Sequence, residues 1–146
     1  YLSKSESNLF GLITAIFNYQ DLPEGALLLT PYLNFKQVLK PQKGKEYKLQ
    51  YLQLLMENLP DKKFILIGDD SQRDMEVYTK IASKNADKIV KVYIRQTGFD
   101  RSEKQEKQWK KLEETGVDAL YFNDDTPVEK EVEAIKKLSK KKWKFF

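Results

Sequence analysis

Three acidic residues follow closely on a short apolar run near the middle of the chain. The run Phe64–Ile67 leads into Gly68, Asp69 and Asp70, and Asp74 lies four residues further on. Clustered acids repel one another unless a cation neutralises them, and a buried apolar strand does not need them at its end. Oxygen ligands at this density suit Mg²⁺, which takes one or two carboxylates together with water and substrate phosphate. The alternative is a turn whose acids cap the following helix near its positive end, and this pattern alone leaves both interpretations open.

Two missing residue types narrow the chemistry of any site in these residues. The chain has no Cys, which excludes disulfides, thiolate nucleophiles and zinc–thiolate sites. It also has no His, which excludes Ser-His-Asp triads, H-E-x-x-H metal sites and phosphohistidine mechanisms within this chain. Catalysis would therefore use carboxylates, Lys, Ser or Thr and, we expect, a hard metal ion.

The elements that must position these acids are predicted by alternating apolar patterns. Helical spacing of apolar residues alternates with short apolar runs along the chain, and helical crossovers between strands imply a mostly parallel sheet covered on both faces. The expected fold is therefore a Rossmann-like three-layer α/β sandwich, in which ligands bind beyond the carboxyl ends of the strands. Predicted helices cover roughly residues 7–19, 46–59, 74–86 and 103–115 and one from Thr126 onward, and predicted strands cover residues 26–29, 64–67, 90–94 and 119–122.

Local signals predict where some of these elements begin and end. Ser5 or Ser7 is placed to cap the first helix, and Gly116 to stop the fourth. The segment from Thr126 to Glu129 combines a capping box with proline at the first helical position. Residues 31–44 have no apolar period and contain two prolines, so they are predicted to form a loop.

Length and charge indicate one domain with a basic tail. The 146 residues suit a single core, here residues 1–135, followed by a tail of residues 136–146. No apolar run predicts a membrane span or signal peptide, so we expect a soluble or membrane-peripheral protein, with a cytoplasmic location favoured. The chain starts at what we interpret as the end of a strand, so we expect a segment upstream of Tyr1.

The net positive charge of the chain lies in the tail. It contains six lysines and no acid, and without them the net charge of +4 becomes −2. Nucleic-acid binding requires positive charge gathered on one face of the domain, whereas here it lies at one end of the chain, so we expect no nucleic-acid partner. The tail also contains Trp143, Phe145 and Phe146, which could hold it peripherally on an anionic membrane. Alternatively, it is a helix end whose aromatic residues dock on the domain and whose lysines favour the negative end of the helix dipole.

Five segments follow one another in a distinctive order: Tyr1–Ser5 with Asn8–Phe10, Leu22–Leu29, Glu46–Leu49, Lys63–Asp69 continuing through Asp74–Tyr78, and Val92–Arg95. Together they resemble the catalytic domain of the actin-patch-type phosphatidate phosphatases and their bacterial relatives, a lipin-like branch of the haloacid dehalogenase superfamily. The resemblance extends from Tyr1 to about Arg95 and continues more weakly through residues 116–126. It implies the haloacid-dehalogenase-like version of the predicted fold, with the strand that bears the first motif lying outside this chain.

The resemblance also implies roles for individual residues. An Asp-x-Asp-x-Thr/Val motif upstream of this chain would supply the nucleophile and a general acid. Ser3 matches the hydroxyl that binds the phosphoryl group, with Ser5 beside it as a further substrate contact, and Lys48 matches the catalytic ammonium that balances the phosphoryl charge. Asp69 matches the Mg²⁺-binding acid, and Asp74 matches the second acid of that motif, a metal ligand or an orienting partner for Lys48. The substrate would be phosphatidate, a related lipid phosphate or another phosphomonoester.

The chain departs from the family pattern at a few positions, and these bear on substrate choice more than on metal binding. Two alternatives also stay open: a phosphatase with a soluble substrate, and a non-catalytic phosphate- or lipid-binding relative that has lost the nucleophile. The departures are Tyr47 where the relatives usually have His, Glu6-Ser7 where they have Pro and an aromatic residue, and Asp70-Ser71 where they have Ser-Gly.

Overall fold

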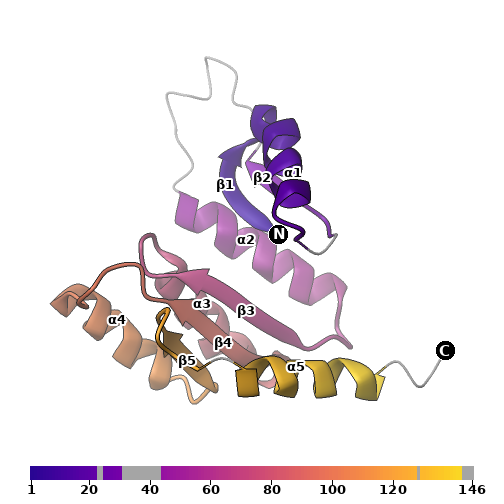
Figure 1. The fold of residues 1–146 in the computed structure, drawn as a ribbon. Helices are drawn as coiled ribbons and strands as arrows, with labels where there is room; N and C mark the ends of the chain where they lie inside the picture. The colour runs from indigo at the N-terminus through magenta and orange to yellow at the C-terminus, as the bar shows by residue number, and fades with distance from the viewer. Residues whose placement is uncertain (23–24, 31–43, 128, 143–146) are drawn as a thin grey trace.

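The computed structural model of the chain describes residues 1–22, 25–30, 44–127 and 129–142 (Figure 1). Strands and helices alternate through these residues, as the apolar pattern predicts. Most of the predicted loop at residues 31–44 and the last four residues of the tail lie outside the described residues. The elements are β1 (Leu2–Glu6), the 3-10 turn η1 (Ser7–Leu9), α1 (Phe10–Tyr19), β2 (Leu28–Thr30), α2 (Gly44–Asn58), β3 (Phe64–Asp69), α3 (Asp74–Asn85), the 3-10 turn η2 (Ala86–Lys88), β4 (Ile89–Arg95), α4 (Glu103–Glu113), β5 (Ala119–Phe122) and α5 (Glu129–Lys142).

All the strand pairs in the described residues are parallel, which confirms the predicted α/β class. β3, β4 and β5 form one sheet in that order, with Asp69 opposite Arg95 and Arg95 opposite Phe122 at its carboxyl edge. β1 pairs with β2 in a second sheet. The described strands therefore form two parallel sheets rather than the single sheet that the sequence predicted, because β1 does not pair with β3.

Helices cover both faces of the three-stranded sheet. Val92 and Ile94 point to the face on which α3 and α4 pack, and both are fully buried with Leu112 of α4. Lys91 and Tyr93 alternate with them and point to the other face, where both contact Glu131 of α5. This sheet and its helices form the expected three layers.

α2 connects the two sheets. It contacts β1 on one side and α3 on the other, and Figure 1 shows its ribbon between the two sheets. Its Met56 is almost fully buried in the core, and the backbone oxygen of Met56 accepts a hydrogen bond of 2.9 Å from Lys88. Leu2 of β1 packs against the same core. The position of α2 therefore determines where its side chains lie relative to the end of β3.

α1 is mostly apolar and carries no charged residue, yet none of its residues is buried. Phe10, Leu12, Ile16 and Tyr19 are all exposed, because neither sheet packs on that side of the helix in the described residues. None of the described helices has the length and apolar content that crossing a bilayer requires.

Several helix ends differ from the predicted caps. α1 follows the turn Ser7–Leu9 and has Leu9 at its N-cap position, without a side-chain cap, so neither Ser5 nor Ser7 caps it. α5 begins at Glu129, and the Thr126 hydroxyl bonds Asn123 Oδ1 at 2.8 Å instead of capping the helix.

The end of the fourth helix was predicted correctly, but its capping box was not foreseen. Ser102 accepts from the Gln105 backbone, and the Gln105 side chain accepts from Ser102. Gly116 has a positive φ of 74°, which is the conformation that a glycine stop provides.

Gly68 is the one glycine of β3, and the sheet cannot accept a side chain there. A Cβ at this position would lie 2.6 Å from Asp74 Oδ2, 2.8 Å from Asp74 Cβ and 2.9 Å from the Tyr78 hydroxyl. The start of α3 therefore packs directly on the backbone of β3, and a glycine is needed for this close approach.

We expect Gly68→Ala to lower the free energy of unfolding by about 1–3 kcal/mol, because α3 must move away from β3 to make room. Urea titration followed by circular dichroism measures this change. Gly11→Ala is the matched control: Gly11 lies in exposed α1 with nothing near its Cβ position, so alanine should stabilise the protein by about 0.5–1 kcal/mol or leave it unchanged. Equal stability of Gly68→Ala and the parent protein would contradict the close packing described here.

Candidate active site

Three of the residues singled out from the sequence meet at the carboxyl end of β3. Lys48 Nζ, from the first turns of α2, lies 2.5 Å from Oδ1 of Asp74, the first residue of α3. Oδ2 of Asp74 accepts a hydrogen bond of 3.4 Å from the backbone N–H of Asp69, the last residue of β3. Residues that are 26 positions apart in the sequence, Lys48 and Asp74, are thus joined beside Asp69.

Asp69 keeps one carboxylate oxygen available. Its Oδ1 accepts from the backbone N–H of Ser71 at 2.9 Å and from the Ser71 hydroxyl at 2.6 Å, which fixes the orientation of the side chain. No other described residue donates a hydrogen bond to Oδ2. The Asp69 carboxylate is therefore oriented at the sheet edge with a free oxygen.

Tyr78 lies beneath these carboxylates as a neutral donor. Its hydroxyl donates to the backbone oxygen of Ile67 at 2.7 Å. Burial raises the pKa of Tyr78 far above its ordinary value, and the negative charges of Asp74 and Asp69 raise it further. The phenol therefore stays protonated and adds no negative charge to a site that already holds two carboxylates.

Asp70, the third acid of the cluster, points away from the other two and is buried, with 6% exposure. Its Oδ1 accepts from Thr97 N at 2.9 Å and Thr97 Oγ1 at 2.6 Å, and its Oδ2 accepts from the Tyr121 hydroxyl at 2.7 Å. Burial would raise the pKa of Asp70, but the bonds from Thr97 and Tyr121 outweigh it and hold this pKa below its ordinary value. Asp70 therefore ties the end of β3 to the β4–α4 loop and to β5.

Tyr47, which stands where the relatives usually have His, is a structural anchor for Lys48. Its side chain is buried and its hydroxyl donates to the backbone oxygen of Leu29 in β2. Burial raises the pKa of Tyr47 to about 12, with a further contribution from the neighbouring Tyr51. Tyr47 thus holds the start of α2 against β2, one residue before Lys48.

Ser3 and Ser5 lie on β1, the strand that contacts α2. The Ser3 hydroxyl donates to Ser5 Oγ at 3.1 Å and accepts from the Ser5 backbone N–H at 3.1 Å. No hydrogen bond among the described residues joins either serine to Lys48, Asp69 or Asp74. Their roles in phosphate binding therefore stay predictions.

The described residues of this site supply some, but not all, of the ligands that a hard cation needs. The free oxygen of Asp69 is the kind of ligand that Mg²⁺ takes together with water and phosphate oxygens. Among the described residues there is no group of three His, Cys, Asp or Glu side chains that could hold a metal ion, so these residues would supply only part of the ligands. Both oxygens of Asp74 are engaged, by Lys48 and by the Asp69 backbone, which favours an orienting role over ligation.

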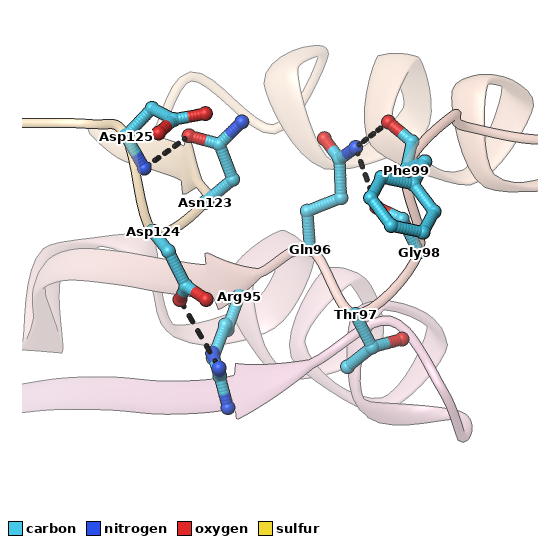
Figure 2. A pocket seen from close by; sticks show the side chains of 8 residues that line it. All are labelled: Arg95, Gln96, Thr97, Gly98, Phe99, Asn123, Asp124 and Asp125. Carbon is cyan, nitrogen blue, oxygen red and sulfur yellow. Dashed lines mark hydrogen bonds and ion pairs between the residues drawn. The ribbon is translucent and has the colours of Figure 1, made fainter.

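A hollow of about 300 Å³ lies at the same edge of the sheet (Figure 2). Loops that follow β4 and β5 form it, and Figure 2 shows the Arg95 and Asp124 side chains meeting at one side of it. The apolar pattern of the sequence does not predict this hollow, although parallel strands bring all their following loops to one edge. The lining residues are Arg95, Gln96, Thr97, Gly98, Phe99, Asn123, Asp124 and Asp125.

Parallel strands with helical crossovers, and acids at the carboxyl end of a strand, place the molecule among the Rossmann-like α/β proteins. Residues 1–96 match the family model described as phosphatidate phosphatase APP1, catalytic domain, and the chain belongs to this family. The matched segment contains every catalytic, metal and substrate residue predicted within this chain.

Two curated relatives are similar to part of this chain. Phosphatidate phosphatase APP1 of Saccharomyces cerevisiae is 31% identical over 96 residues, covering 65% of this chain and 16% of that protein. The uncharacterized protein C29B5.04c of Schizosaccharomyces pombe is 23% identical over 102 residues, covering 68% of this chain and 16% of that protein. The chain thus spans about one sixth of the length of these relatives. No solved structure matches the chain.

The hydrogen bonds that Asp70 accepts from Thr97 and Tyr121 should contribute to stability, and conservative substitutions test this. Asp70→Asn should lower the free energy of unfolding by about 1–3 kcal/mol, since three hydrogen bonds to a buried charge are weakened. Tyr121→Phe should remove one of these bonds, and its effect should be smaller in the Asp70→Asn background. Denaturant titrations of the four proteins in this cycle measure the coupling.

Asp100→Asn serves as the control for this cycle, because Asp100 is an exposed acid in the same β4–α4 loop. It should change the free energy of unfolding by less than about 0.5 kcal/mol. Strictly additive effects of Asp70→Asn and Tyr121→Phe would show that the bond between these residues does not contribute to stability.

Proposed function

We propose that this chain is part of a Mg²⁺-dependent phosphatase of the haloacid dehalogenase type that hydrolyses phosphatidate or a related lipid phosphate. The observation that carries the proposal is the arrangement of Lys48, Asp74 and Asp69 at the carboxyl edge of β3, within the segment that matches the family. Phosphoryl transfer depends mainly on positioning and on neutralising charge, and this arrangement provides an ammonium and an oriented carboxylate with one oxygen that could take a hard cation.

Each residue has a defined part in this proposal. Lys48, held by Asp74, faces the phosphoryl oxygens and balances their negative charge as the bond to the leaving oxygen breaks. Asp69 binds Mg²⁺, which when bound neutralises charge on the phosphoryl group and its attacking carboxylate. Ser3 and Ser5 donate hydrogen bonds to phosphoryl oxygens from β1.

The nucleophile in this proposal is the first Asp of an Asp-x-Asp-x-Thr/Val segment upstream of this chain. Its carboxylate oxygen attacks phosphorus, the alcohol leaves with a proton from the second Asp, and water then hydrolyses the aspartyl-phosphate to release inorganic phosphate. The lack of His in the chain is compatible with this route, since each proton moves through a carboxyl group. A strand carrying the segment would end beside Asp69 if it paired between β1 and β3, the two strands that lie unpaired with each other.

The upstream sequence is the most direct test of the nucleophile. An Asp-x-Asp-x-Thr/Val at the end of an apolar run supports catalysis by the intact protein. Any other residue at the first Asp would instead support the alternative function, a phosphate- or lipid-binding relative without the nucleophile.

Asp69→Asn in the intact protein should reduce Mg²⁺-dependent phosphate release from phosphatidate by at least about 100-fold, because it removes one charge from the metal site without changing side-chain volume. Phosphate release from mixed micelles measures the effect. Asp61→Asn is the matched control, since Asp61 is exposed in the turn before β3, at the opposite edge of the sheet, and activity should be unchanged. Activity of Asp69→Asn close to the parent level would remove Asp69 from the mechanism.

The proposal also includes contact with a membrane, because the protein has to reach a lipid phosphate within a bilayer. The last residues, Trp143–Phe146, lie outside the described residues, so the argument rests on their composition. Deleting Lys140–Phe146 should weaken binding of the intact protein to vesicles containing an anionic lipid, and the loss should shrink as salt is raised. Vesicle sedimentation measures this. Unchanged binding would favour the docked helix end, and a soluble or peripheral cytoplasmic protein stays the expected location.

A further inference from the structure

Arg95 lies directly opposite Asp69 in the parallel register of β4 and β3. Neighbouring strands are about 4.8 Å apart, and residues that are partners in a parallel register point to the same face of the sheet. The side chains of Arg95 and Asp69 therefore leave the sheet on the same face at its carboxyl edge. Lys48 reaches this edge through Asp74, which packs on the opposite face against Gly68.

The present partner of Arg95 is weak. Its guanidinium lies 3.1 Å from Oδ1 of Asp124, and the two side chains are 55% and 85% exposed. Exposed ion pairs contribute little to stability, because water screens both charges and each long side chain loses rotational freedom. Asp124 therefore holds Arg95 only loosely, and a ligand with a higher negative charge would compete for it.

The rest of the hollow is held in place by hydrogen bonds (Figure 2). The Gln96 side chain donates to the backbone oxygens of Gly98 and Phe99 at 2.9 and 2.8 Å. Thr97 is bonded to the buried Asp70 through both its backbone and its hydroxyl. The wall beside Arg95 is thus fixed, while its ion pair with Asp124 faces solvent.

We propose that Arg95 is a second phosphate-binding cation of this site. In this inference, which rests on the proposed function, the guanidinium exchanges Asp124 for the phosphoryl oxygens of a substrate held at Asp69. It contacts the phosphoryl group from the face of the sheet opposite Lys48. An arginine suits this position because its planar fork can donate two parallel hydrogen bonds to a phosphoryl group. Asp124 is its resting partner and competes with the phosphate.

Binding of inorganic phosphate to the intact protein in the presence of Mg²⁺, measured by titration calorimetry, tests this inference without relying on turnover. Arg95→Met should raise the Kd for phosphate about tenfold, since it removes hydrogen bonds to a charged group. Arg95→Lys should keep part of the affinity. Asp124→Asn should lower the Kd, because it removes the competing carboxylate, and this gain should vanish in the Arg95→Met background.

Asp125→Asn is the matched control. Asp125 is an exposed acid that lines the same hollow, and it is not paired with Arg95. Removing the charge of Asp125 should change the Kd for phosphate by the same factor whether or not Arg95 is present. Circular dichroism and denaturant titration verify that each variant is folded, and Arg95→Lys replaces Arg95→Met as the deciding variant if the latter does not unfold cooperatively.

The outcomes separate the role of Arg95 from the proposed function. Phosphate affinity that is unchanged in Arg95→Met, or an Asp124→Asn gain that persists without Arg95, overturns the inference. Phosphate binding that depends on Arg95 in a protein that releases no phosphate from phosphatidate supports the inference and counts against the proposed enzyme. Full phosphate release with an unchanged KM in Arg95→Met counts against Arg95 and leaves the enzyme in place.

Discussion

The buried carboxylate of Asp74 joins three elements of the structure, and the candidate site depends on it. One oxygen binds Lys48 of α2, the other accepts from the Asp69 backbone in β3, and Asp74 itself begins α3. A buried carboxylate is costly unless it is paired and hydrogen-bonded, and here both conditions are met. Gly68 permits the arrangement, because any side chain there would collide with Asp74. The position of Lys48 is therefore tied to the packing of α3 on β3.

Three acids that are close in sequence have different surroundings and different roles. Asp74 is buried against a lysine, Asp70 is buried against Thr97 and Tyr121, and Asp69 keeps a free oxygen at the edge. Peptide geometry accounts for part of this difference, since Asp69 and Asp70 follow each other at a strand end and point in different directions. The mutual repulsion that a cluster of acids suggests is thereby reduced, and one carboxylate remains available for a cation.

The apolar patterns predicted the helices α1 to α5 and the strands β2 to β5, with some bounds displaced. They did not predict the full strand β1, in which Leu2 is the only apolar residue. The meeting of Lys48, Asp69 and Asp74 could be expected from the family resemblance and from the common edge of parallel strands. The roles of Asp70 and Arg95 could not, because they depend on register and on side-chain direction, which apolar patterns do not encode. The predicted caps at Ser5, Ser7 and Thr126 were wrong for a related reason: a hydroxyl near a helix start can satisfy a nearby turn instead, as Thr126 does with Asn123.

The proposed function places a phosphate dianion beside carboxylates, and the charges at the sheet edge bear on this proposal. Asp69 and Asp74 carry two negative charges, and Lys48 and Arg95 carry two positive charges, so these four side chains sum to zero. Under the proposed function, a Mg²⁺ ion and a phosphate dianion would together add no net charge to these four side chains, and the upstream nucleophilic carboxylate would add one negative charge. Cations reach the edge from both faces of the sheet, Lys48 through α2 and Arg95 through β4, so the phosphoryl group would be held between them rather than on one side. An edge of parallel strands makes this possible, because it is the part of an α/β fold where side chains from both faces converge.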